Sequence, residues 1–302
     1  RYYTCFYSNL YLGGFRNYGS IGHNYYGLSV NHGVNVVHDW ALSVNNGART
    51  VKLGSGAIVG YDKLDLSPGI DLKYDSVTGY SAAAQTKMPH AWKSGTQVQL
   101  LRNQVLNMKK GGTFVMVPPT NPYRCPPGPY ERVSMVAHLL KNNNPTANII
   151  VVDPKTKFSK QGLFMAGWEK HYPGMIEWIS ADTHGGIKKI NTSTVEFETD
   201  LDTFKADAAS VIPAQQAGRI AMNAGVNKGD WCPIVPASMQ SQAIWFASCA
   251  FLIWVGFRFT NNIYNDSSTP VIAKVLATGF CGSVALFTLG VFAQVGGIRS
   301  GV

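Results

Sequence analysis

Gly112-Thr-Phe-Val-Met-Val117 and Asn148-Ile-Ile-Val-Val-Asp153 are two apolar runs of strand length, and together they decide the fold of this 302-residue chain. Between them, residues 130–141 carry apolar side chains at helical spacing: Val133, Val136, Ala137 and Leu140. A strand, a loop, a helix and a second strand within about 45 residues form a βαβ unit. The sequence therefore predicts an α/β fold with a parallel sheet.

Shorter patterns continue this α/β arrangement on both sides of the βαβ unit. Downstream, we expect strands at residues 175–179, 187–190, 194–198 and 206–212, and an alanine-rich helix at residues 214–224. Upstream, we expect strands at residues 32–39, 50–53, 57–59 and 64–69, with a glycine-containing turn between the second and third.

The turn after the first apolar run reads Pro118-Pro-Thr-Asn-Pro-Tyr-Arg-Cys-Pro-Pro-Gly-Pro129. Proline has no amide hydrogen to offer a phosphate, so we expect no dinucleotide at this βαβ unit. The turn instead presents Cys125 just before a helix start, where the helix terminus and Arg124 would lower the pKa of the thiol. Glu131 is a candidate proton acceptor, and the competing interpretation is a buried structural cysteine.

A second proline-held cysteine, Cys232, lies in Gly229-Asp-Trp-Cys-Pro-Ile234. A redox disulfide with Cys125 becomes possible if the fold brings the two sulfurs together. Cys5 lies among aromatic residues, and its spacing leaves its role open. Five cysteines so widely separated predict neither a disulfide framework nor a metal site.

The chain is basic, with 26 Lys and Arg against 17 Asp and Glu. These basic residues are scattered and form no run, so we expect no nucleic-acid partner. The excess charge is either a solvated basic face or a docking face for an acidic redox partner.

Charge almost disappears near the C-terminus, because residues 242–302 contain three basic residues and one acidic residue. Two apolar segments, 243–257 (extendable to 264) and 271–298, approach or reach the length that spans a lipid bilayer. They predict a two-helix transmembrane hairpin, with a pair of buried core helices as the alternative.

Five motifs carry a family resemblance. They are Tyr2-Tyr-Thr-Cys-Phe-Tyr-Ser-Asn9, Met88-Pro-His-Ala-Trp-Lys93, Pro122-Tyr-Arg-Cys-Pro-Pro-Gly-Pro-Tyr-Glu-Arg132, Phe158-Ser-Lys-Gln161 and Gly229-Asp-Trp-Cys-Pro233. Over residues 1–240 the chain resembles the flavoprotein subunit of flavocytochrome c sulfide dehydrogenase, within the flavoprotein disulfide reductase-like superfamily.

The resemblance implies specific roles for four residues. Cys125 and Cys232 correspond to the redox disulfide that oxidises sulfide, and Glu131 corresponds to a candidate acid/base. Cys5 corresponds to the cysteine linked covalently to FAD. The chain contains no glycine-rich loop to hold the ADP part of FAD, so this cofactor is expected from the resemblance alone.

We therefore predict three regions: residues 1–108 as a partial FAD-domain-like region, 109–241 as a second Rossmann-like unit with Cys125 and Cys232, and 242–302 as the transmembrane hairpin. One hypothesis is a membrane-anchored flavoenzyme that oxidises sulfide or thiols and passes electrons to a c-type cytochrome. The other is a non-catalytic accessory subunit of a respiratory or photosynthetic membrane complex that has lost FAD. The resemblance places the body on the periplasmic, lumenal or intermembrane side.

Overall fold

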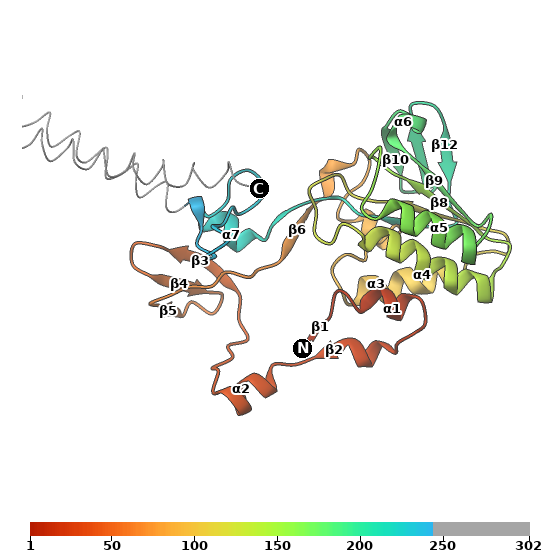
Figure 1. Ribbon diagram of the computed structural model, residues 1–302. Coiled ribbons are helices and arrows are strands. Elements are labelled where there is room, and N and C mark those ends of the chain that lie inside the picture. Colours follow the sequence, from red (N-terminus) through yellow and green to blue (C-terminus); the bar gives the residue numbers. More distant parts are fainter. Residues whose placement is uncertain (244–302) are drawn as a thin grey trace, which may run out of the picture. The chain divides into compact units, whose positions relative to one another are not determined.

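The computed structural model describes residues 1–243, and these form two compact units (Figure 1). The first unit comprises residues 1–40 and 69–218, and the second comprises residues 41–68 with the segment that starts at Arg219. The domain boundaries predicted at residues 108 and 241 separate the FAD-domain-like region, the second Rossmann-like unit and the hairpin, and they stay a prediction. The predicted hairpin lies, apart from its first two residues, outside the described residues. Within residues 1–243, no helix has the length and apolar character needed to cross a membrane.

A four-stranded parallel sheet forms the centre of the first unit. Its strands, in spatial order, are β13 (Ala208–Val211), β7 (Thr113–Val117), β8 (Asn148–Val152) and β9 (Ile176–Ile179). The helix α4 (Gly128–Asn143) connects β7 to β8. Since β7 and β8 are parallel neighbours joined by α4, the predicted βαβ unit is confirmed. Both strands are rich in apolar residues because the two faces of a parallel sheet are buried.

Helices pack together beside this sheet (Figure 1). They are α1 (Ser8–Leu12), α3 (Thr96–Leu106), α4 and α5 (Gln161–His171). All four apolar residues that predicted α4 are buried. On the same buried stripe lies Arg132, four residues before Val136 and 2% exposed. A charged residue at a core position marks α4 as more than a packing element.

Smaller elements complete the first unit. The antiparallel pairs and triples are β1 (Tyr2–Tyr3) with β2 (Gly22–His23), β6 (Ile70–Lys73) with β14 (Ala214–Ala217), and β10 (Ile187–Asn191), β11 (Glu196–Thr199) and β12 (Thr203–Lys205). The remaining helices are α2 (Tyr26–His32) and α6 (Ala181–His184), with 3-10 turns at Tyr18–Ile21, Tyr74–Ser76 and Ala84–Thr86. Buried residues of the central sheet and of β10 and β11 share one core cluster.

Three sequence predictions are wrong, each because of a tertiary or turn effect. The alanine-rich segment 214–224 begins as strand β14, since its pairing with β6 overrides helix propensity. Only Arg219–Asn223 is helical, as α7. Residues 32–39 form no strand, because α2 ends at Gly33 in a left-handed conformation and the following residues have no strand partner. Residues 64–69 are also not a strand, and β6 starts immediately after them.

The second unit contains an antiparallel sheet of β3 (Ala41–Asn45), β4 (Thr50–Leu53) and β5 (Ile58–Gly60). The predicted strands at 50–53 and 57–59 are thus confirmed, with Gly56 in the turn at a φ of 91°. Helix α7 belongs to the same unit, and the Asn46 side-chain amide donates to the Ala224 carbonyl at 3.1 Å. Isolated bridges at Lys228–Trp231 and Ile234–Ser241 flank Cys232 on either side.

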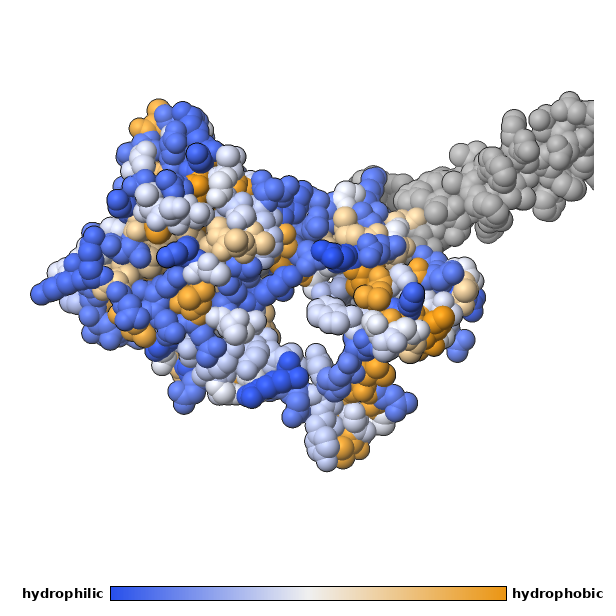
Figure 2. All heavy atoms as spheres, turned by 180° about the vertical axis from the view of Figure 1, so that it is seen from behind, coloured by the Kyte–Doolittle hydropathy of each residue, from blue (hydrophilic) through white to orange (hydrophobic). Residues whose placement is uncertain are grey.

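On the face that Figure 2 shows, the described residues are mainly hydrophilic, with small apolar areas among the polar ones. Several large apolar side chains of the first 40 residues are exposed, among them Phe6, Tyr26 and Trp40. Single exposed apolar residues are ordinary on protein surfaces.

Candidate functional site: a cysteine at the start of α4

Cys125 lies at the end of the turn that joins β7 to α4, three residues before the helix begins at Gly128. Its side chain is exposed and its backbone is left-handed, with a φ of 62°. Several bonds hold the turn. Among them, the Tyr123 hydroxyl donates to the Pro126 carbonyl at 2.7 Å, and the Lys155 ammonium donates to the Pro119 carbonyl at 2.8 Å. The prolines and these bonds fix where the sulfur is presented.

The pKa of the Cys125 thiol is raised, contrary to the sequence prediction. Partial burial is the largest cause, and the nearby Glu131 and Cys5 raise it further. The Gly128 amide and Arg124 act in the opposite direction, as expected for a helix terminus and a cation, but they do not prevail. The local rule for helix termini is therefore outweighed by desolvation and by neighbouring negative groups.

Arg124 connects Cys5 to the same turn. Its guanidinium donates to the Cys5 sulfur at 3.2 Å and also to the Trp92 carbonyl. The Cys5 thiol in turn lies 3.8 Å from that carbonyl. The structure thus brings together Cys5, which is 120 residues away in sequence, and the turn that carries Cys125.

Glu131 lies in the first turn of α4, and one of its carboxylate oxygens accepts a bond from the Asn9 side-chain amide at 2.8 Å. Asn9 belongs to α1 and is 6% exposed. Three of the four predicted site residues, Cys5, Cys125 and Glu131, therefore lie in one region of the first unit.

Cys232 belongs to the second unit, where it is partly buried. Burial raises the pKa of its thiol. Cys5, Cys125 and Cys232 are all free thiols in this structure, and the pairing of Cys125 with Cys232 stays a prediction.

Asp153 follows β8 at the carboxyl edge of the sheet, where α/β folds usually bind ligands. It is 0% exposed, and its carboxylate oxygens accept bonds from the Tyr130 hydroxyl (2.6 Å), the Trp178 indole (2.9 Å) and the Lys155 ammonium (2.8 Å). In a dinucleotide-binding unit, a carboxylate at this edge would bind the ribose, but here internal partners already occupy the Asp153 carboxylate. This agrees with the proline-rich turn, which predicts that no dinucleotide binds at this unit.

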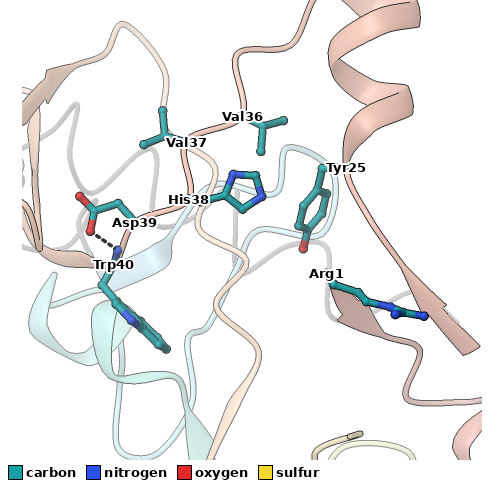
Figure 3. A pocket seen from close by; sticks show the side chains of 7 residues that line it. All are labelled: Arg1, Tyr25, Val36, Val37, His38, Asp39 and Trp40. Atoms are coloured by element: carbon teal, nitrogen blue, oxygen red, sulfur yellow. Dashed lines mark hydrogen bonds between the residues drawn. The ribbon is translucent and has the colours of Figure 1, made fainter. Parts of the chain in front are cut away.

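A surface hollow of about 560 Å³ lies elsewhere on the first unit (Figure 3). It is lined by Arg1, Tyr25 and residues 36–40, and contains none of the predicted site residues. The ring centres of Tyr25 and His38 are 6.4 Å apart, and the Trp40 amide donates to the Asp39 carboxylate at 2.7 Å. The hollow is open and its lining contains no cysteine, so it is not the site that the sequence analysis predicts.

One family model matches part of the first unit. Residues 98–213 match the family model for the central region of the flavoprotein chain of sulfide dehydrogenase (flavocytochrome c). This matched region contains Arg124, Cys125, Glu131, Arg132 and Asp153.

Solved structures show the fold over a longer stretch. Putidaredoxin reductase in its covalent complex with putidaredoxin has a TM-score of 0.57 at 13% identity, covering 76% of this chain and 53% of that one. Sulfide:quinone oxidoreductase from Aquifex aeolicus has a TM-score of 0.55 at 17% identity, and the match covers 79% of this chain and 55% of that one. The ferredoxin reductase for the CYP199A2 system of Rhodopseudomonas palustris has a TM-score of 0.56 at 14% identity, and the match covers 76% of this chain and 54% of that one.

The chain has the mixed α/β fold of the flavoprotein disulfide reductase-like proteins and spans about half the length of these matched structures. At such low identity the likeness concerns the fold alone.

The residues around Cys5 fit the ring system of a flavin. Among the buried polar atoms of residues 1–243 that have no hydrogen-bond partner, three are donors on residues linked to the Cys125 turn: the Trp92 indole N–H, Arg124 Nε and the Gln215 amide nitrogen. Hydrogen bonds link these three residues, because the Arg124 backbone amide donates to the Gln215 side-chain oxygen at 3.0 Å and the Arg124 guanidinium donates to the Trp92 backbone carbonyl. Carbonyl and ring-nitrogen acceptors, such as those of an isoalloxazine, would satisfy these donors.

Sequence reasoning missed Asn9, Trp92, Arg132 and Gln215. Arg132 gave one signal, because it falls on the apolar stripe of α4. Asn9 and Trp92 lie within two of the motifs that carry the family resemblance, but those motifs gave them no role, and Gln215 lies in none of the five.

Proposed function

We propose that the chain is a subunit of a membrane electron-transfer complex that oxidises sulfide or a related thiol at a Cys125–Cys232 disulfide. The observation that carries the proposal is the placement of Cys125, Glu131 and Cys5 in one region, within and beside a segment that matches the sulfide dehydrogenase flavoprotein.

In the proposed reaction, hydrosulfide attacks one sulfur of the disulfide. A new S–S bond forms, the Cys125–Cys232 bond breaks, and its electron pair leaves on the other cysteine as a thiolate. Glu131, held by Asn9, accepts the proton that hydrogen sulfide loses as it becomes the nucleophile. Arg124 and the Gly128 amide stabilise negative charge at Cys125.

A flavin would supply the acceptor for the electron pair of the thiolate. Cys5 would anchor it, and Trp92, Arg124 and Gln215 would donate to its ring. We place a c-type cytochrome and larger membrane subunits downstream of the flavin. The segment 242–302 is proposed as a lipid-embedded anchor, with the body on the periplasmic, lumenal or intermembrane side.

One observation favours the second candidate, a non-catalytic accessory subunit of a respiratory or photosynthetic complex. The pKa values of both proposed redox thiols are raised, whereas reactive cysteines usually have lowered ones. In that role the cysteine region would be a retained scaffold without a cofactor.

The visible absorption spectrum of the detergent-purified protein, recorded before and after acid precipitation, separates the two. A flavin spectrum that stays with the precipitate would show covalent attachment, and its loss in a Cys5→Ser variant would locate the bond. A colourless protein would reject the flavoenzyme and favour the accessory subunit.

A further inference from the structure

Trp92 is held tightly inside the first unit. Its backbone carbonyl accepts from the Arg124 guanidinium, and its backbone amide donates to the His90 ring at 2.9 Å. The two residues before it are also held, because Arg132 donates to the His90 and Ala91 carbonyls, both at 2.6 Å. The Arg132 guanidinium covers the Trp92 ring, 5.2 Å from the ring centre. With 4% of its surface exposed, Trp92 is fixed in place.

The far edge of the Trp92 ring meets the start of α4. Gly128 has no side chain, and a methyl carbon placed there would lie only 2.7 Å from Cη2 of the ring. The same carbon would lie 3.0 Å from the Cys125 sulfur. The ring and the sulfur therefore border one small space, which stays open because residue 128 is a glycine.

The Cys5 sulfur contacts the other end of Trp92. It lies 3.8 Å from the Trp92 backbone carbonyl and accepts from the Arg124 guanidinium at 3.2 Å. Since Cη2 is at the end of the indole that points away from the main chain, the two sulfurs lie beside opposite ends of one residue. Both thiols are free in this structure.

We propose that Trp92 is a positioning residue that keeps the Cys5 and Cys125 thiols from forming a disulfide with each other. A disulfide needs its sulfurs about 2 Å apart, and the packed ring holds Cys125 at the far end of Trp92 from Cys5. Cys125 then remains available to Cys232. The inference rests on the proposed function, in which Cys125 is a redox sulfur, and it names the residue that determines which cysteines pair.

The test is oxidation by diamide of the full-length chain in detergent. The chain is produced in a riboflavin-starved host, so that Cys5 stays a thiol, and every variant carries Cys232→Ser, so that Cys232 cannot compete for Cys125. Diamide takes two electrons and two protons from a pair of thiols and becomes the hydrazine, while the thiols form a disulfide. Peptide mass spectrometry without reduction then measures the Cys5–Cys125 linked peptide. A strained disulfide is disfavoured by several kcal/mol, so Trp92→Ala should raise the linked peptide by about tenfold or more.

Two variants separate this role from simple loss of packing. Trp92→Phe keeps an aromatic ring at the position, so we expect it to restore most of the separation. The matched control is Trp168→Ala, because Trp168 is also 4% exposed. Its indole donates to Ser134 of α4 at 2.9 Å and stacks on Phe158, away from the Cys125 turn. The control therefore loses an equally buried ring beside the same helix, and its linked peptide should stay at the level seen with Trp92 intact.

The proposal is overturned if the linked peptide forms as readily with Trp92 intact as in Trp92→Ala. It is also overturned if Trp168→Ala raises the peptide as much as Trp92→Ala does. Should Trp92→Ala fail to fold, Trp92→Leu keeps apolar volume without the ring edge at Gly128, and an unchanged level there would overturn the proposal as well. The measurement involves neither sulfide nor Cys232, so failure of the sulfide chemistry alone rejects the proposed function and not this inference.

Discussion

Replacing Asp153 by Asn removes the charge from a carboxylate that four donors share. One oxygen binds the ammonium and the backbone amide of Lys155, and the other binds Tyr130 and Trp178. An asparagine offers one oxygen, so its NH₂ group must face either the ammonium or the indole N–H. Lys155, whose side chain is 8% exposed, would also lose its counterion.

Breaking a buried ion pair by removing one partner costs about 3–5 kcal/mol. With a urea m-value of about 2 kcal/mol/M, the unfolding midpoint of the Asp153→Asn variant should fall by about 2 M. Urea titration followed by Trp fluorescence measures this midpoint, since Trp178 contacts the carboxylate directly.

The matched control is Asp200→Asn. Asp200 pairs with Lys188 at 3.2 Å, and the two side chains are 45% and 52% exposed. Screening by water should limit its cost to below about 1 kcal/mol. Adding Lys155→Met to Asp153→Asn removes the stranded cation and should recover part of the stability. A cost for Asp153→Asn no larger than that of Asp200→Asn would refute the reasoning.

Three further predictions test other parts of the structure. Because its pKa is raised, Cys125 should be alkylated more slowly than free cysteine at pH 8 and reach half-maximal rate at a higher pH; a lower midpoint would contradict the site description. The folded-state pKa of His90, about 3, lies below its unfolded value of about 6.5. Its contribution to stability is therefore complete above that unfolded value and is lost as pH falls toward 3; His90→Gln should flatten this part of the stability curve. Finally, Gly128→Ala places a methyl group 2.7 Å from the Trp92 ring and should cost about 1–3 kcal/mol in denaturation, whereas Gly162→Ala meets nothing and should cost none.

The sheet was predictable because its information is local. After their first residues, Thr113 and Asn148, the runs at 113–117 and 148–152 are wholly apolar, as is usual for strands with both faces covered. The apolar spacing of the segment between them has helical period. The proline-rich turn likewise placed Cys125 before a helix without any knowledge of distant contacts.

What the sequence did not reveal depends on long-range contacts. Residues 214–217 form a strand because they pair with residues about 140 positions earlier. Their alanine content therefore predicted a helix wrongly. Asn9 reaches Glu131 across 122 residues. The same contacts explain the wrong pKa direction for Cys125, because burial and the approach of Cys5 are not visible in the turn itself.

Sulfide treatment of the oxidised protein, followed by peptide mass spectrometry, tests the proposed sulfur chemistry most directly. After formation of the disulfide and addition of sulfide, we predict one extra sulfur atom on the Cys125 or the Cys232 peptide and a free thiol on the other. Cys125→Ser and Cys232→Ser should each abolish the product. If the wild-type protein gains no persulfide, or if both variants gain as much persulfide as the wild type, the two cysteines are not a sulfide-oxidising pair.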